Sequence, residues 1–112
     1  MQSTTSEIRL KIQLDENKIP QKLSWSASDT QGLEKECKAI NLSIWDAADK
    51  DTLRVDLWTK DLQVDEMSTH FLQTLISLAE TYEKATGIKN IVNETKSFCM
   101  SLAKQISEHS RS

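Results

Sequence analysis

The chain has 112 residues, of which 38% are hydrophobic and 28% charged, and its formal net charge is −3. A chain of this length forms one domain and buries roughly two-thirds of its unfolded surface, so folding requires neither a metal nor a disulfide. Basic residues gather in no part of the sequence, which argues against nucleic-acid binding and against a polybasic segment for membrane surfaces.

The expected compartment is the cytoplasm. Residues 1–7 are polar and lack the apolar segment of a secretory signal. No apolar run approaches the ~20 residues of a membrane span. The two cysteines, Cys37 and Cys99, lie far apart and fit no metal-binding spacing, so we expect two reduced, partly buried thiols.

The first half of the chain shows the period-two alternation of β-strands with one apolar face. In the first of them, Ile8, Leu10, Ile12 and Leu14 alternate with polar residues, and a polar turn precedes Pro20. Trp25 shares the parity of Leu23 and is expected in the core. Whether the first strand is central or lies at a sheet edge stays open at this point. The expected strands cover residues 7–14, 20–27, 36–45 and 52–60.

The third and fourth expected strands are joined by a short polar connection and predict an antiparallel hairpin. Pairing Ile44 with Leu53 also brings two further apolar pairs into register on the same face. Those two pairs are Leu42 with Val55 and Ile40 with Leu57.

Helical periodicity predicts two helices, residues 65–86 and 89–108, with Asp65 as N-cap and Gly87 ending the first of them. The expected apolar stripes are Met67, Phe71, Leu75, Leu78 and Tyr82 on the first helix and Ile91, Thr95, Phe98, Leu102 and Ile106 on the second. The predicted fold class is therefore α+β: a single domain of residues 1–112, with one four-stranded antiparallel sheet (ββββαα) and both helices packed on one sheet face.

No constellation for catalysis emerges. A phosphate site requires a glycine-rich loop, and the chain has two isolated glycines. His70 and His109 have no second ligand at zinc spacing. The acidic residues of loop 46–51 lack the glycine and distal glutamate of a calcium loop, and Asp56 with Asp61 has no pocket signature. We therefore expect no enzymatic activity, no metal and no cofactor.

Two tryptophans instead suggest a binding surface. Trp45 and Trp58 share the parity of Arg54 and Asp56, on the strand face expected to meet solvent. They would lie about 20 Å apart along the hairpin, at ~3.3 Å per residue. Exposed tryptophan and arginine are enriched in protein interfaces, so these four residues are the candidate protein-binding site. The alternatives are cover by loops, by the N-terminal tail or by a second subunit, and a bulge that reverses the parity.

Several segments are similar to those of one known family. DTLRVDLWTKD at residues 51–61, continuing through VDEM at 64–67, resembles the signature of the gliding-motility accessory protein GldC. Segments LDENK (14–18), LSWSA (23–27) and SIWD (43–46), with Phe98-Cys99, also resemble this family. The resemblance implies a small protein without a signal peptide that supports the gliding apparatus, beside membrane-associated motility components. It implies no enzymatic activity and no cofactor.

Two functions remain in competition. In the first, the domain is an accessory or adaptor protein that binds a membrane-associated motility component and lies at the inner membrane through that partner. It binds no nucleic acid and inserts into no membrane, and homo-oligomerisation stays open. In the second, the protein is a chaperone similar in outline to SecB, which holds export or envelope clients; this comparison is an analogy of fold.

Overall fold

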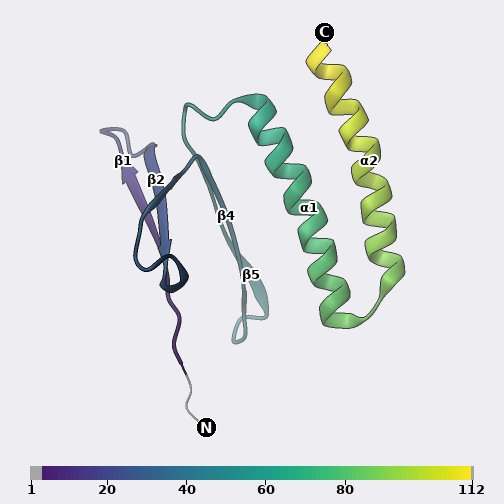
Figure 1. Ribbon diagram of the computed structural model, residues 1–112, viewed down its shortest axis with the longest axis horizontal. Coiled ribbons are helices and arrows are strands. Elements are labelled where there is room, and N and C mark those ends of the chain that lie inside the picture. Colours follow the sequence, from purple (N-terminus) through teal and green to yellow (C-terminus); the bar gives the residue numbers. More distant parts are fainter. Residues whose placement is uncertain (1–3, 112) are drawn as a thin grey trace. The chain divides into compact units, whose positions relative to one another are not determined.

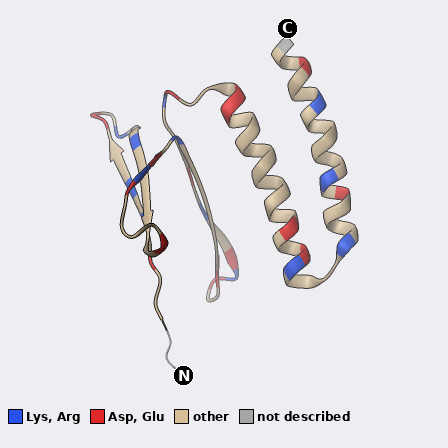
Figure 2. Cartoon of the chain, in the orientation of Figure 1, with Lys and Arg blue, Asp and Glu red and all other residues tan. Residues whose placement is uncertain are grey.

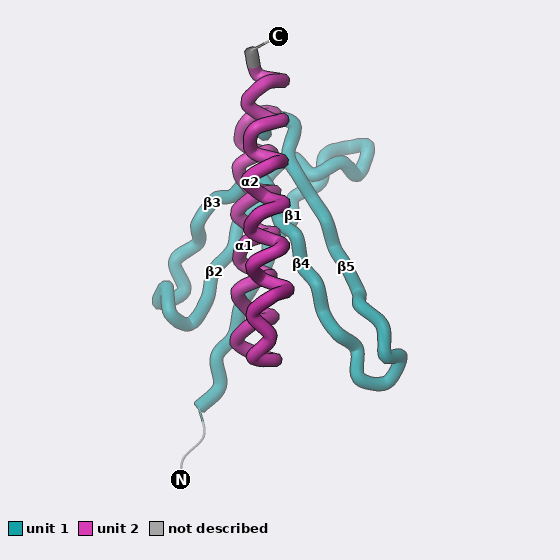
Figure 3. Tube along the Cα trace, turned by 90° about the vertical axis from the view of Figure 1, so that its right-hand side faces the viewer, with its two compact units in different colours: residues 1–62 teal, residues 63–112 magenta. Residues whose placement is uncertain are grey.

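The computed structural model describes residues 4–111 and divides the chain into two compact units, residues 1–62 and 63–112 (Figure 3). The first unit contains every strand found in the described residues (Figure 1). The second unit contains two helices of 23 residues each.

The N-terminal part of the first unit is a three-stranded antiparallel sheet. Within the described residues, its strands are β1 (Ile8–Leu14), β2 (Pro20–Ala27) and β3 (Lys35–Cys37), in the order β1-β2-β3. A tight turn joins β1 to β2: the Asp15 carboxylate accepts the amides of Asn17 and Ile19 at 2.8 and 3.0 Å. The N-terminal strand therefore lies at an edge of its sheet.

The apolar residues of this sheet share one face, as the alternation predicts. Ile12 lies opposite Leu23, and Leu10 lies opposite Trp25. Leu23 is completely buried. Trp25, expected in the core, is half-buried, and the Lys35 Nζ lies 5.5 Å from the centroid of its ring.

The prediction of a single four-stranded sheet is wrong. The expected strand 36–45 bends at Lys38, and its two parts belong to different sheets. The part before the bend, β3, pairs with β2, whereas the part after it, β4 (Ala39–Asp46), pairs with β5 (Asp51–Trp58). At the bend, the Lys38 carbonyl accepts the Thr59 amide at 2.9 Å. A strand that bends in this way passes from one sheet to the next.

The hairpin of β4 and β5 has the predicted register. Ile44 pairs with Leu53, Leu42 with Val55 and Ile40 with Leu57, so the apolar residues lie on one face. Its connection closes with the amide of Lys50 donating to the Asp46 carbonyl at 2.8 Å. Lys50 has a φ of 52°, the left-handed conformation that such a turn requires.

The second unit is a helical hairpin of α1 (Val64–Thr86) and α2 (Lys89–Arg111). The N-cap of α1 is Gln63, two residues before the predicted Asp65, and its amide donates to Glu66 Oε1 at 2.9 Å. Asp65 instead lies in the first turn, where its negative charge interacts favourably with the positive end of the helix dipole. Gly87 ends α1 as predicted, with a φ of 76° and its amide bonded to the Glu83 carbonyl.

The most buried residues of this hairpin lie beside the predicted stripes rather than on them. Ala79 on α1 and Val92 and Cys99 on α2 are buried. Of the residues predicted to face the core, half are half-buried and half are exposed. The half-buried ones are Met67, Leu75, Thr95, Leu102 and Ile106, and the exposed ones are Phe71, Leu78, Tyr82, Ile91 and Phe98. On α2, the exposed Ile91 and Phe98 immediately precede the buried Val92 and Cys99, a rotation of about 100° around the helix. Small side chains at the contact allow two helices to approach closely.

Candidate protein-binding site

The candidate residues lie on the face of the β4–β5 sheet opposite its apolar pairs. Across the two strands, Asn41 pairs with Asp56, Ser43 with Arg54, Trp45 with Thr52 and Ala39 with Trp58. We call this surface the polar strip, which comprises Asn41, Ser43, Trp45, Arg54, Asp56 and Trp58. The strip follows directly from the period-two geometry of the hairpin, because alternate residues of both strands share a face.

The two tryptophans stand at opposite ends of the polar strip. Trp45 lies opposite Thr52, six residues from Trp58 along β5, a separation of roughly 20 Å at ~3.3 Å per residue. Trp45 is 66% exposed and Trp58 58%. The described loops therefore leave most of each indole accessible, and no bulge reverses their parity between residues 39 and 58.

A hydrogen-bonded network fills the strip between the tryptophans. The Arg54 guanidinium donates to both oxygens of Asp56, from Nη2 at 2.6 Å and from Nε at 3.2 Å. Its Nη1 donates to Ser43 Oγ, and Asn41 Nδ2 donates to Asp56 Oδ1 at 2.7 Å. This forked pairing fixes the planes of both groups and leaves the centre of the strip without net charge.

The network also shifts the acid–base properties of its members. The hydrogen bond from Arg54 lowers the pKa of Asp56 below its ordinary value, and the bond from Asn41 lowers it further. The hydrogen bond and charge of Asp56 raise the pKa of Arg54. Both groups therefore remain ionised across the physiological range, and the pair persists there.

Replacing Arg54 by glutamine is expected to raise the pKa of Asp56 toward the ordinary value of about 3.9. Because the folded-state pKa of Asp56 is lowered, its stabilising contribution is present above the unfolded pKa and is lost as the pH falls through the folded one. The variant should therefore lose less stability than the wild type on acidification below about pH 4. A carboxyl titration by NMR measures the pKa, and urea unfolding from pH 2.5 to 7 measures the stability.

Asp15 and Asp61 serve as internal controls for that titration. Their pKa values are also lowered, by a backbone bond to Ile19 and by the Thr59 hydroxyl respectively. Neither group contacts Arg54, so their titration should not move in the variant. An unchanged Asp56 pKa in Arg54→Gln would contradict the role assigned to the guanidinium.

A second polar group of residues lies where the chain passes between the two sheets. Glu36, Cys37, Lys38, Thr59 and Asp61 line a cavity of about 310 Å³. The Thr59 hydroxyl donates to Asp61 Oδ1 at 2.5 Å. Burial, together with the charge of Glu36, raises the pKa of Cys37, so its thiol stays protonated. A protonated thiol is a poor nucleophile, and the cavity therefore lacks an activated one.

The structure separates Asp56 and Asp61, the carboxylates that the sequence suggests as a pair. Asp56 bonds Arg54 and Asn41, whereas Asp61 bonds Thr59. Within residues 4–111, no three His, Cys, Asp or Glu side chains gather into a metal-binding group. Both cysteines are free thiols in the described part of the chain, Cys37 half-buried and Cys99 buried.

Charged residues of both signs are spread along the described part of the chain, and its helices are not strongly apolar. Figure 2 shows basic and acidic residues interspersed in both units, without a stretch of one sign. Neither α1 nor α2 combines the length and the apolarity that crossing a membrane would require.

The comparisons with known proteins assign the chain to a family. The family described as "Gliding motility-associated protein GldC-like" matches residues 20–108, which include the whole polar strip. The chain belongs to the GldC-like family. No curated protein and no solved structure matches the chain.

Proposed function

We propose that this GldC-like protein is a non-enzymatic accessory protein of bacterial gliding motility, and that it binds a protein partner through the polar strip. The family description supports the association with gliding. The observation that carries the binding surface is the pair of exposed tryptophans on either side of a fixed Arg54–Asp56 pair.

The composition of the strip matches the residues that dominate protein interfaces. Tryptophan and arginine supply a disproportionate share of binding energy when they enter pockets on a partner. The guanidinium of Arg54 is already held by Asp56 and Ser43, so binding costs little further loss of side-chain freedom. We propose a membrane-associated motility component as the partner, with this protein in the cytoplasm and held at the inner membrane through it.

A chaperone of the SecB type is the second candidate, and one observation favours it. Both helices of the hairpin expose large apolar side chains, to which an unfolded client could bind. These are Phe71, Leu78 and Tyr82 on α1 and Ile91 and Phe98 on α2. The two candidates predict different sets of bound proteins, a few defined components in one case and many unrelated chains in the other.

Replacing both tryptophans of the strip by alanine separates these candidates. Loss of one interface anchor costs about 2 kcal/mol or more, which weakens binding roughly 30-fold. In a cross-linked pull-down from the native cells, the wild type should recover one or two defined motility or envelope proteins. The Trp45→Ala/Trp58→Ala variant should lose them while its circular dichroism stays unchanged.

A truncation elsewhere provides the matched control. Met100 on α2 is 74% exposed and lies outside the polar strip, so Met100→Ala should retain the partners. Recovery of many unrelated unfolded chains by all three proteins would favour the chaperone. An unchanged list of defined partners in the tryptophan variant would overturn the polar strip as the binding surface.

A further inference from the structure

The outer edge of β1 has no strand beside it. β1 pairs with β2 on one side, and within residues 4–111 no other strand pairs with it. Its pairing with β2 runs without irregularity from Ile8 to Gln13, and the strand contains no proline. A regular edge of this length presents a row of backbone donors and acceptors that can pair with another chain. β3, at the opposite edge of this sheet, has three residues.

The two faces of β1 differ in chemistry. Ile8, Leu10 and Ile12 lie on one face, beside Leu23 and Trp25 of β2, and remain exposed themselves. Arg9 and Lys11 lie on the other face, and both are exposed. A strand that adds to this edge therefore meets apolar side chains at alternate positions and positive charge at the positions between them.

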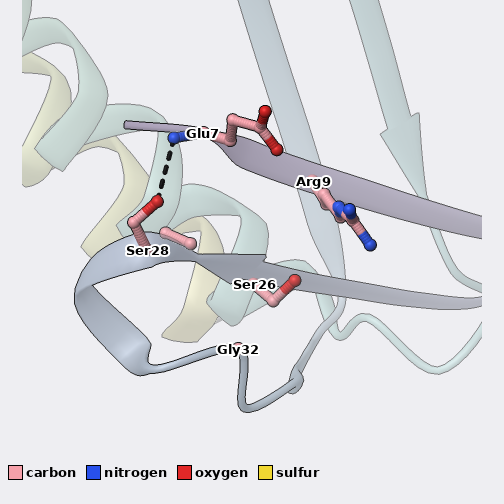
Figure 4. Close-up of a pocket in the computed structure, with 6 residues that line it drawn as sticks. Glu7, Arg9, Ser26, Ser28 and Gly32 are labelled. Atoms are coloured by element: carbon pink, nitrogen blue, oxygen red, sulfur yellow. Dashed lines mark hydrogen bonds between the residues drawn. The ribbon is translucent and has the colours of Figure 1, made fainter. Parts of the chain in front are cut away.

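A groove runs along the charged face. It consists of two adjoining hollows of about 180 and 160 Å³ that share Arg9, Ser26 and Gly32. Figure 4 shows the residues that line the first of these hollows. Lys11 Nζ already pairs with Glu34 at 2.7 Å, whereas the Arg9 guanidinium has no ion-pair or hydrogen-bond partner in residues 4–111. Glu7 also lines the groove; its amide donates to Ser28 Oγ at 3.0 Å, and its carboxylate forms no ion pair with Arg9. The free Arg9 guanidinium can therefore pair with an incoming carboxylate, whereas Ser24 and Ser26, which also line the groove, belong to β2 and lie on the side of β1 away from its free edge.

Charge decides what kind of strand fits this edge. A second copy of β1 could align antiparallel with its apolar residues on one face. The registers that pair most of β1 set Ile8 against Ile12 or Leu14, and they bring Arg9 opposite Lys11 or Lys11 opposite itself; only shorter registers bring Glu7 opposite Arg9 or Lys11. Like charges directly opposite one another destabilise a strand pair. Pairing with a second copy along most of β1 is therefore disfavoured, and a strand with carboxylates at the intervening positions is favoured.

We propose that β1 accepts an extended segment of another protein by strand addition, and that this segment alternates apolar with acidic residues. The backbone of the segment would pair with the free edge of β1, its apolar side chains would cover Ile8, Leu10 and Ile12, and one carboxylate would pair with Arg9. This surface is separate from the polar strip, and the proposal holds whether or not the strip binds a partner.

Two synthetic peptides of eight residues test the charge rule on the full-length protein. One alternates Val with Glu and the other Val with Lys, both with blocked termini. The acidic peptide should shift the NMR amide signals of residues 8–14 and bind at least about tenfold more tightly than the basic one. Equal binding of the two peptides, or shifts confined to another surface, would overturn the proposal.

A charge reversal at Arg9 and a matched reversal elsewhere test the role of the guanidinium. Arg9→Glu should weaken binding of the acidic peptide about tenfold, because a carboxylate then faces a carboxylate. Lys104→Glu, the corresponding change on exposed α2, should leave binding unchanged. The same loss in both variants would show a general charge effect and contradict the assignment to Arg9.

Methylated peptides test strand addition itself. An added strand forms hydrogen bonds with the edge of β1 through the N–H groups of every second residue. Methylation of these backbone nitrogens should abolish binding, whereas methylation of the alternate nitrogens, which point away from β1, should preserve it. Equal binding of the two methylated peptides would exclude strand addition. The Trp45→Ala/Trp58→Ala variant should bind the acidic peptide like the wild type, so a failure of the polar strip is distinguishable from a failure at β1.

Discussion

Replacing Leu23 by alanine is expected to lower the free energy of unfolding by about 2–5 kcal/mol, the range for truncating a buried leucine. Leu23 is 0% exposed and lies in the central strand of its sheet, paired with Ile12 on one side and Cys37 on the other. Neighbours on both sides restrict how far the sheet can collapse into the space that the side chain leaves. Urea unfolding followed by tryptophan fluorescence measures the loss.

Leu33 provides the control for this substitution. It belongs to the same unit and carries the same side chain, but it is 69% exposed. Leu33→Ala should change the unfolding free energy by less than about 0.5 kcal/mol. Similar losses in the two variants would mean that Leu23 is not the core of the first unit.

The largest effect in the second unit is expected for Val92→Asp. Val92 is 2% exposed in the helical hairpin, so the new carboxylate would be buried at a site that has evolved to hold an apolar side chain. An isolated buried charge is costly, and we expect a loss of more than about 3 kcal/mol at pH 7. Urea unfolding followed by circular dichroism of the helices measures this loss.

The pH dependence of that variant gives an independent check. Burial raises the folded-state pKa of the new carboxyl above about 3.9, so the penalty should shrink at pH 4, where the group becomes neutral, and grow as the pH rises. The neighbouring Asn93 is exposed, and Asn93→Asp makes a similar change of charge on the outside of α2. A destabilisation as large in Asn93→Asp as in Val92→Asp would contradict the burial of Val92.

Much of the candidate site can be predicted from the sequence, because the register of a hairpin fixes which residues share a face. Once Ile44 is set against Leu53, the period of two places Arg54 and Asp56 on one face and the two tryptophans at its ends. Arg54 and Asp56 are two residues apart on one strand, so their pairing also follows from the alternation. The free edge of β1 does not follow, because strand order depends on contacts between distant segments.

One residue of the sequence indicates that the strands divide into two sheets, although the apolar and polar residues alternate on both sides of it. Lys38 shares the parity of Ile40 and Leu42, so an unbroken strand would place a lysine in an apolar row. The chain bends there, and the Lys38 carbonyl bonds Thr59, a residue 21 positions later. The parity of Lys38 indicated that the strand is interrupted there, but the geometry of the bend depends on a contact with Thr59, just after the end of β5.

The sequence by itself determined the α+β class, the register of the β4–β5 hairpin, the helix end at Gly87 and the composition of the polar strip. These features depend on neighbours along the chain and on periods of two or 3.6 residues. The tertiary structure decided where the strand bends, which strand lies at the edge and which face of each helix is buried. The large side chains of α2 suggested the face of Phe98, yet Val92 and Cys99 are buried. Periodicity reports that a helix has apolar faces, whereas close packing between two backbones selects the face with the smaller side chains.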